Sequence, residues 1–458
     1  MRANRIAIAT LVLALSAAAA GPWSRFRGPN GTGIAMGNGY PVLLNPEGNA
    51  IWKAPVRPGK SSPVLTDDAV FLTAYDEGKL YTQCFDRRTG RLLWERAVER
   101  KREAHLSQLN EPAAHTPTTD GESVYVMYRD VGLLSYDAEG ELRWLTELGS
   151  FGNSNGHAAS PVLAGDKVIV QADQIADSYI VAIDKTNGEI VWRTPREESE
   201  GWATPAVYGD EQVLTTSFGW LGAHRVADGM RLWGLQALSP RIIASPVVVA
   251  DSVYSFGYGV HSIAGFLQGF DASDKDGDGK LKQDEYQTND FLLALARHAG
   301  NRDGIVTRDE ILVASRPFVS PSQLSAFRLS ESGPPRELWS YERSFNQVVP
   351  SPLVYEGVLY FVRNGGILES LDAETGEVLK RGRLRDAIGG YSASPVAADG
   401  KIYLASEDGK ITTLAAGQEW KVLGTSDLEA DIFATPALSD GAIFVRTHQT
   451  LYCFGEPR

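Results

Sequence analysis

The chain has 458 residues and a formal net charge of −13. Because a surface with this excess of acidic groups repels polyanions, nucleic acid is excluded as an expected partner. Forty-six glycines, abundant aromatic residues and short apolar runs are typical of many short strands joined by turns. Only two cysteines occur, Cys84 and Cys453, which excludes a disulfide framework. Their apolar surroundings are compatible with two buried thiols or with one bridge.

Residues 1–20 are typical of an export signal. Arg2 and Arg5 precede an apolar stretch over 6–16 that is too short to span a bilayer, and residues 18–20 are alanines of the kind a signal peptidase accepts. We expect a cleaved signal peptide over 1–20, a periplasmic or secreted protein, and no membrane span after cleavage. A retained membrane anchor is the alternative.

A Ser/Thr-Pro step recurs eight times in the remaining sequence. The steps are Ser62-Pro63, Thr116-Pro117, Ser160-Pro161, Thr204-Pro205, Ser245-Pro246, Ser351-Pro352, Ser394-Pro395 and Thr435-Pro436. Successive prolines are 54, 44, 44, 41, 106, 43 and 41 residues apart, so the fifth interval contains an insertion.

A second signal, a glycine shortly before a tryptophan, recurs in most of these copies. The pairs are Gly48/Trp52, Gly90/Trp94, Gly140/Trp144, Gly188/Trp192, Gly229/Trp233 and, one residue tighter, Gly417/Trp420. Trp339 ends the copy with the insertion, and Lys380 replaces the tryptophan in the sixth copy. The glycine closes a hairpin, and the tryptophan after it is expected to pack against the next unit.

Each copy therefore predicts four short strands, and the whole predicts an all-β, eight-bladed propeller over 21–458. A four-stranded sheet cannot bury both faces alone, and radial repetition solves this problem. Residues 49–56 precede the first copy and the last copy has only three strands, so the N-terminal strand is expected to close the ring. An open solenoid is the alternative.

The Asp-x-x-Thr-Gly-x-x-x-Trp runs, as in residues 86–94, resemble the tryptophan-docking repeats of the pyrroloquinoline-quinone-like propeller family. Residues 23–33 resemble the opening of exported bacterial members, and the resemblance covers the mature chain apart from the insertion. It implies the propeller fold and, in catalytic members, a quinone held over the axis by calcium and a vicinal disulfide, with an aspartate base. This chain has no Cys-Cys pair, so pyrroloquinoline quinone is not expected. The chain also resembles the propeller lipoproteins of the outer-membrane barrel assembly machinery, without their lipidated cysteine.

The insertion, residues 260–322 within blade five, contains a twelve-residue loop with the ligand spacing of a calcium-binding EF-hand. The expected Ca²⁺ ligands are the carboxylates of Asp274, Asp276 and Asp278, the carbonyl of Lys280 and both oxygens of Glu285. An acidic surface loop that binds nothing is the alternative. A weaker second loop offers Asn301, Asp303 and Glu310, but Ala299 stands where its first carboxylate belongs. Leu281 and Val306 are expected to pair the two loops.

The insertion joins the second and third strands of its blade, so it is expected on the same face as the loops between blades. The candidate binding residues on that face are His105, Asn110, Asn153, Asn155, His157, Trp202, Arg241, Asn346 and Tyr391. Each one alone is equally compatible with a solvated loop. We expect a monomeric, non-catalytic, calcium-binding scaffold for a protein, peptide or glycan; a quinone-dependent dehydrogenase is the alternative.

Overall fold

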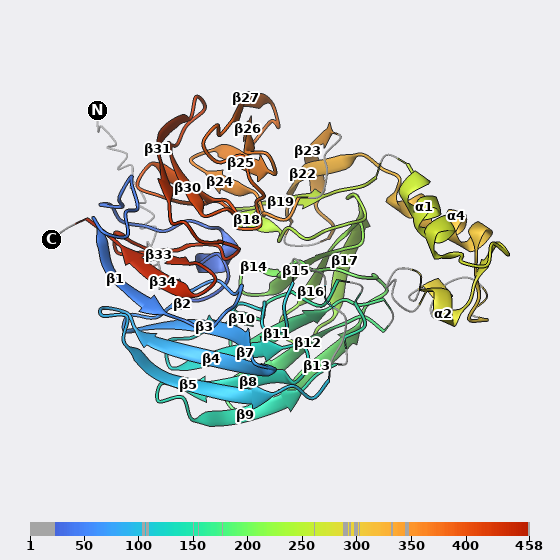
Figure 1. Cartoon of the computed structure of the whole chain (residues 1–458), viewed down its shortest axis with the longest axis horizontal. Coiled ribbons are helices and arrows are strands. Elements are labelled where there is room, and N and C mark those ends of the chain that lie inside the picture. The colour runs from blue at the N-terminus through green and yellow to red at the C-terminus, as the bar shows by residue number, and fades with distance from the viewer. Residues whose placement is uncertain are drawn as a thin grey trace, which may run out of the picture.

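The computed structural model describes residues 23–456, except 103–105, 107–109, 150, 154, 176, 261, 287–291, 293–294, 297–300, 302, 331–332 and 344–347. The predicted signal peptide lies outside these residues. Eight four-stranded antiparallel sheets stand around a central axis, which confirms the eight-bladed propeller (Figure 1). Short strands with alternating or continuous apolar side chains bury both faces of each sheet against the neighbouring blades.

The strands of blades one to four are β2 (Val64–Leu65), β3 (Ala69–Asp76), β4 (Lys79–Asp86), β5 (Leu92–Glu99), β6 (Thr118–Thr119), β7 (Ser123–Tyr128), β8 (Gly132–Asp137), β9 (Leu142–Glu147), β10 (Val162–Ala164), β11 (Lys167–Ala172), β12 (Tyr179–Asp184), β13 (Ile190–Pro195), β14 (Ala206–Tyr208), β15 (Gln212–Ser217), β16 (Trp220–Arg225) and β17 (Arg231–Gln236). Those of blades five to eight are β18 (Val247–Val249), β19 (Ser252–Gly257), β22 (Ser322–Arg328), β23 (Arg336–Arg343), β24 (Leu353–Tyr355), β25 (Val358–Arg363), β26 (Ile367–Asp372), β27 (Val378–Arg383), β28 (Val396–Ala398), β29 (Lys401–Ala405), β30 (Lys410–Ala415), β31 (Lys421–Asp427), β32 (Ala437–Ser439), β33 (Ala442–Arg446), β34 (Thr450–Phe454) and β1 (Ala50–Pro55).

The N-terminal strand closes the ring as predicted. β1 is the outermost strand of blade eight and pairs antiparallel with β34, with Trp52 opposite Cys453. Both cysteines are buried free thiols, which decides against a bridge between Cys84 and Cys453. Burial disfavours the thiolate and raises the pKa of each to about 12.

The repeated tryptophans dock onto the next blade rather than onto their own. A side-chain carbon built on Gly90 would lie 2.5 Å from the Trp52 ring, so only glycine permits this close packing. The indole N–H of Trp52 donates to the Arg87 carbonyl in the same turn of the next blade. The same packing joins Trp94 to Gly140, Trp144 to Gly188, Trp192 to Gly229 and Trp339 to Gly376.

Blade six departs from this pattern because it carries Lys380. The Lys380 ammonium lies 4.5 Å from the centre of the Trp420 ring and donates to the Trp420 carbonyl at 2.8 Å. Gly417, the turn glycine of blade seven, has open space where Gly90, Gly140, Gly188, Gly229 and Gly376 each meet a tryptophan ring.

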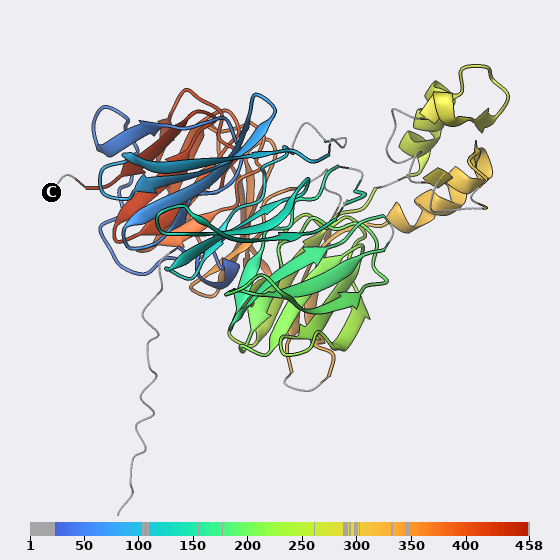
Figure 2. The same ribbon diagram turned by 90° about the horizontal axis from the view of Figure 1, so that it is seen from below.

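The insertion is a helical module that projects to one side of the ring of blades (Figure 2). It consists of α1 (Ala264–Ser273), β20 (Lys280–Leu281), α2 (Gln283–Tyr286), β21 (Val306–Thr307), α4 (Arg308–Ser315) and η2 (Arg316–Phe318). Leu281 pairs with Val306, as the sequence predicted. Both belong to an apolar cluster whose described members all come from the insertion.

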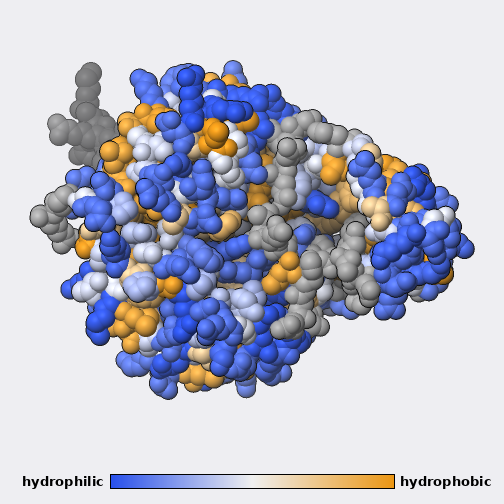
Figure 3. Space-filling model, in the orientation of Figure 1, coloured by the Kyte–Doolittle hydropathy of each residue, from blue (hydrophilic) through white to orange (hydrophobic). Residues whose placement is uncertain are grey.

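Hydrophilic residues predominate on the face seen in Figure 3, with hydrophobic residues scattered in small groups. Many of the exposed apolar residues lie on the outermost strands of the blades, such as Leu142 and Ile190. In the part of the chain that the structure describes, no helix has the length and apolar character needed to cross a bilayer.

Candidate functional site

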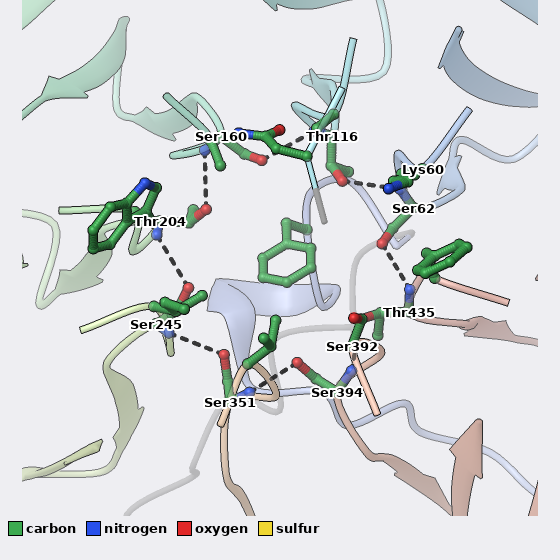
Figure 4. A pocket seen from close by; sticks show the side chains of 18 of the residues that line it. Lys60, Ser62, Thr116, Ser160, Thr204, Ser245, Ser351, Ser392, Ser394 and Thr435 are labelled. Carbon is green, nitrogen blue, oxygen red and sulfur yellow. Dashed lines mark hydrogen bonds between the residues drawn. The ribbon is translucent and has the colours of Figure 1, made fainter. Parts of the chain in front are cut away.

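A closed ring of eight hydrogen bonds surrounds the propeller axis (Figure 4). We call the residues that form it the hydroxyl ring. They are the Ser and Thr residues of the eight Ser/Thr-Pro steps: Ser62, Thr116, Ser160, Thr204, Ser245, Ser351, Ser394 and Thr435. The backbone N–H of each residue donates to the hydroxyl oxygen of the next at 2.9–3.1 Å. The N–H of the last member donates to the hydroxyl of the first at 3.0 Å.

The Ser/Thr-Pro step explains why this ring forms. Proline has no backbone N–H, so it leaves no donor unpaired where the innermost strand begins. The Ser or Thr before it has a short side chain, whose hydroxyl reaches the backbone N–H of the neighbouring blade. All eight ring residues are buried, with Ser245 the most exposed at 6%. A buried N–H without an acceptor costs about 1–3 kcal/mol, so the ring satisfies eight backbone donors where the blades converge.

A second set of side chains, the variable ring, lies two residues before each member of the hydroxyl ring. Residues two apart in an extended chain point to the same side, so both rings face the axis. In every blade the variable-ring residue is partly exposed, whereas the residues before and after it are buried. The members are Lys60, Ala114, Ala158, Trp202, Ile243, Val349, Ser392 and Phe433.

The N-terminal segment closes one end of the axis. Arg25 donates to the carbonyl of Pro205 in blade four, and Arg27 donates to that of Pro352 in blade six, both at 2.7 Å. Burial disfavours both cations, which lowers the pKa of Arg25 to about 10 and that of Arg27 to about 9. Phe26, between them in sequence, lines the axial pocket.

The axial pocket has a volume of about 260 Å³. Both rings line it together with Phe26, Asn110, Asn155, Arg241 and Tyr258. None of its described lining residues carries a carboxylate. Burial lowers the pKa of Lys60, while it raises the pKa of Tyr258.

Four residues predicted for the binding face line this pocket: Asn110, Asn155, Trp202 and Arg241. Asn153 is buried beside it, and its amide donates to the Asp173 carbonyl. The predicted residues His105 and Asn346 lie outside the described residues.

The structure corrects the placement of His157 and Tyr391, which are fully buried between blades. Both lie three positions before the hydroxyl ring, so they point away from the axis. His157 donates to the Gln171 carbonyl at 2.7 Å and accepts from His115 at 2.9 Å. The Tyr391 hydroxyl donates to the Ala387 carbonyl.

Sequence reasoning missed Phe26, Lys60, Tyr258 and Phe433. Lys60 and Phe433 carried a usable signal, because each stands two residues before a Ser/Thr-Pro step. Phe26 and Tyr258 carried none, because the N-terminal segment and the end of β19 reach the axis only through tertiary packing.

The first loop of the module gathers its acidic side chains. Single oxygens of Asp274, Asp276 and Asp278 lie within 4.8 Å of one another. The Lys282 ammonium contacts Asp276 at 2.9 Å and Asp278 at 2.8 Å, which lowers the pKa of Asp276. Glu285 accepts the N–H groups of Lys275 and Lys282 through its two oxygens. Backbone N–H donors fix the loop in the same way through Asp274, Asp276 and Asp278.

The second loop has a similar internal bonding pattern. Glu310 accepts the N–H groups of Asn301 and Thr307, matching the role of Glu285 in the first loop. Asp303 accepts the N–H of Ile305 and the side-chain amide of Asn301.

Phe318, at the end of the module, connects it to the propeller. Its ring centre lies 5.5 Å from that of Phe266 in α1 and 5.3 Å from that of Phe218 in blade four. The Arg241 guanidinium of the axial pocket lies 5.2 Å from the centre of the same ring. The Phe318 carbonyl also accepts the N–H of Val260. The module is therefore in contact with the rim of the pocket.

The family described as outer membrane protein assembly factor BamB matches residues 30–157, 83–264 and 328–457. The chain belongs to this family. The BamB match is interrupted where the helical module lies.

BamB of Shewanella oneidensis is 23% identical over 295 residues, which cover 56% of this chain and 71% of that protein. BamB of Yersinia pestis is 21% identical over 346 residues, 72% of this chain and 78% of that protein. The crystal structure of BamB from Moraxella catarrhalis aligns with a TM-score of 0.58 at 14% identity, covering 88% of this chain and 98% of that one. A europium-containing methanol dehydrogenase aligns with a TM-score of 0.60 at 10% identity, covering 95% and 98%. These two likenesses show the shared fold.

The axial pocket of this BamB-family chain does not fit the quinone centre that the family resemblance implies for catalytic members. That centre needs an acidic base and calcium ligands over the axis, and the described residues of the pocket contribute neither a carboxylate nor a thiol. Its volume also falls below the roughly 300–1,000 Å³ of pockets for drug-sized ligands.

Proposed function

We propose that this chain is an exported, non-catalytic, protein-binding scaffold that takes part in outer membrane protein assembly. The observation that carries the proposal is the axial pocket, which offers hydroxyl, amide, aromatic and cationic groups for binding but no described acid–base pair for chemistry. Its BamB relatives carry the name of outer membrane protein assembly factors, which supports protein partners.

The test is deletion of the gene in its host, followed by complementation with the full chain. We expect deletion to lower the amount of β-barrel proteins in the outer membrane, and the complementing chain to restore it and to cross-link to another assembly protein. The complementing protein should be found in the periplasm without residues 1–20, and ultracentrifugation of the purified protein should show a monomer. Unchanged outer membrane composition, together with alcohol oxidation by the purified chain after addition of pyrroloquinoline quinone and Ca²⁺, would favour the dehydrogenase.

We also propose that the first loop binds one Ca²⁺ through Asp274, Asp276, Asp278, the Lys280 carbonyl and Glu285. Without a cation these carboxylates repel one another, and the Lys282 ammonium lies between two of them. Calcium, with its higher charge and preference for several oxygens, displaces that ammonium. The second loop, with Asn301, Asp303 and Glu310, acts as a structural partner.

Calorimetric titration of chelator-treated protein with Ca²⁺ tests this assignment. We expect one ion per chain, loss of binding in Asp274→Ala, and unchanged binding in Asp309→Ala, a matched control for an exposed aspartate in the first turn of α4. No Ca²⁺ binding by the unaltered chain would refute the site. Binding of two ions would show that the second loop is also a ligand site.

A further inference from the structure

The axial pocket has an excess of hydrogen-bond donors. Each oxygen of the hydroxyl ring accepts one backbone N–H, and within the described part of the chain none of these eight hydroxyls donates to a protein acceptor. The indole N–H of Trp202 is buried and has no partner among the described residues. A ligand that supplies acceptor oxygens would satisfy these groups.

Positive charge also gathers at this pocket, in a chain whose net charge is −13. Lys60 and Arg241 line it from blades one and five, which stand opposite each other in a ring of eight. Arg25 and Arg27 are buried beneath it, and no carboxylate lies within ion-pair distance of either among the residues described. Burial strengthens the attraction of such cations for an anion, because little solvent screens them.

Two carboxylates lie behind the pocket wall, and both are engaged there. Glu111 accepts the backbone N–H of Lys60, and Glu407 accepts the hydroxyl of Ser392. Their negative charges partly offset the effect of burial on the pKa of Lys60, and neither glutamate lines the pocket.

The rest of the lining is apolar and aromatic. Phe26 forms the closed end, while Trp202, Ile243, Val349 and Phe433 belong to the variable ring. The Lys60 ammonium lies 4.5 Å from the centre of the Phe433 ring, so a cation and an aromatic surface stand side by side. A volume of about 260 Å³ suits a chain end better than a folded surface.

We infer that the axial pocket binds the C-terminal carboxylate of a polypeptide whose last side chain is apolar. The carboxylate is held by Lys60 and the hydroxyl donors around the axis, and Arg241 attracts it from the opposite side of the ring. The last side chain packs against Phe26, Trp202 and Phe433. This inference rests on the proposed role as a protein-binding scaffold and names the part of a partner that the scaffold recognises.

The experiment measures binding of a short, fluorescently labelled peptide ending in phenylalanine to the full mature chain, by fluorescence anisotropy. The matched probe is the same peptide with a C-terminal amide. We expect the amide to bind at least tenfold more weakly, because it loses the charge-assisted hydrogen bonds. Lys60→Met and Arg241→Gln should each weaken binding of the free acid about tenfold, and Arg385→Gln, an exposed cation in a loop between blades, should leave it unchanged.

Equal binding of acid and amide, or no binding of either, overturns the inference. Acetylphenylalanine that binds as tightly as the peptide also overturns it, in favour of a pocket for small carboxylic acids. Cross-linking to assembly proteins is measured separately, in host cells complemented with the same chain. If the unaltered chain cross-links but does not bind the peptide, the chain-end site is refuted and the proposed scaffold function is retained. If it does not cross-link, the scaffold function itself is refuted.

Discussion

The propeller and the inserted module achieve order by different means. In the propeller, each apolar cluster draws residues from neighbouring blades, and the docking tryptophans and the hydroxyl ring repeat the same contacts around a closed circle. In the module, the described residues of the apolar cluster all belong to the insertion, and Phe318 makes an aromatic contact with the blades. The propeller is therefore expected to unfold as a unit, while the module opens by itself and depends on its loops.

The largest effect is expected when a docking contact of the propeller is removed. Trp94→Ala should lower the free energy of unfolding by about 3–5 kcal/mol, because the indole is 8% exposed and its N–H donates to Ala138. Trp202→Ala, in the partly open pocket, is the control and should cost far less. Denaturant unfolding followed by fluorescence of the remaining tryptophans gives both values, and equal losses would contradict the docking role.

Acid should act next most strongly, and on the propeller. Burial lowers the pKa of His157 to about 4 and holds that of His115 below its usual value, with Arg129 nearby adding to both shifts. The unfolded chain binds more protons below about pH 6.5, so stability is fully present above that pH and falls as the pH approaches 4, by on the order of 3 kcal/mol for His157. In equilibrium unfolding measured between pH 7 and pH 4, His157→Asn should reduce the loss of unfolding free energy. His448→Asn, which alters an exposed histidine, should leave that loss unchanged.

Calcium should act on the module alone. At a free concentration one hundred times the dissociation constant, Ca²⁺ should stabilise the module by about 2.7 kcal/mol. No tryptophan lies between residues 259 and 322, so tryptophan fluorescence reports the propeller and amide hydrogen exchange reports the module. We expect slower exchange in α1 and α4 with an unchanged fluorescence melt, and no calcium effect in Glu285→Gln. A calcium-dependent shift of the fluorescence melt would show that the two regions are coupled through Phe318.

The smallest effect should come from restoring the repeat in blade six. Lys380→Trp fills the open space above Gly417 and should raise the free energy of unfolding by about 1 kcal/mol, because apolar burial exceeds the lost contact of the ammonium with Trp420. Lys421→Trp on β31, an exposed position next to Trp420, is the control and should change little. A destabilised Lys380→Trp protein would show that the lysine is better suited to this interface than the repeat pattern indicates.

The sequence determined the architecture, because a contact that is made in every blade requires the same residue type at the same position of every repeat. Eight Ser/Thr-Pro steps, seven tryptophans at one repeat position and an unpaired N-terminal strand predicted the blade number, the docking contacts and the closure between β1 and β34. The spacing of the acidic residues in the first loop likewise comes from local geometry alone, as does the pairing of Leu281 with Val306.

The tertiary structure decided which loop residues face the axis. His157 and Trp202 both lie just before a Ser/Thr-Pro step, but the alternation of an extended chain turns the first between two blades and the second into the pocket. The N-terminal segment that places Phe26, Arg25 and Arg27 at the axis has no repeat partner in the sequence. Its position depends on contacts with blades distant along the chain, so only the folded ring could show it.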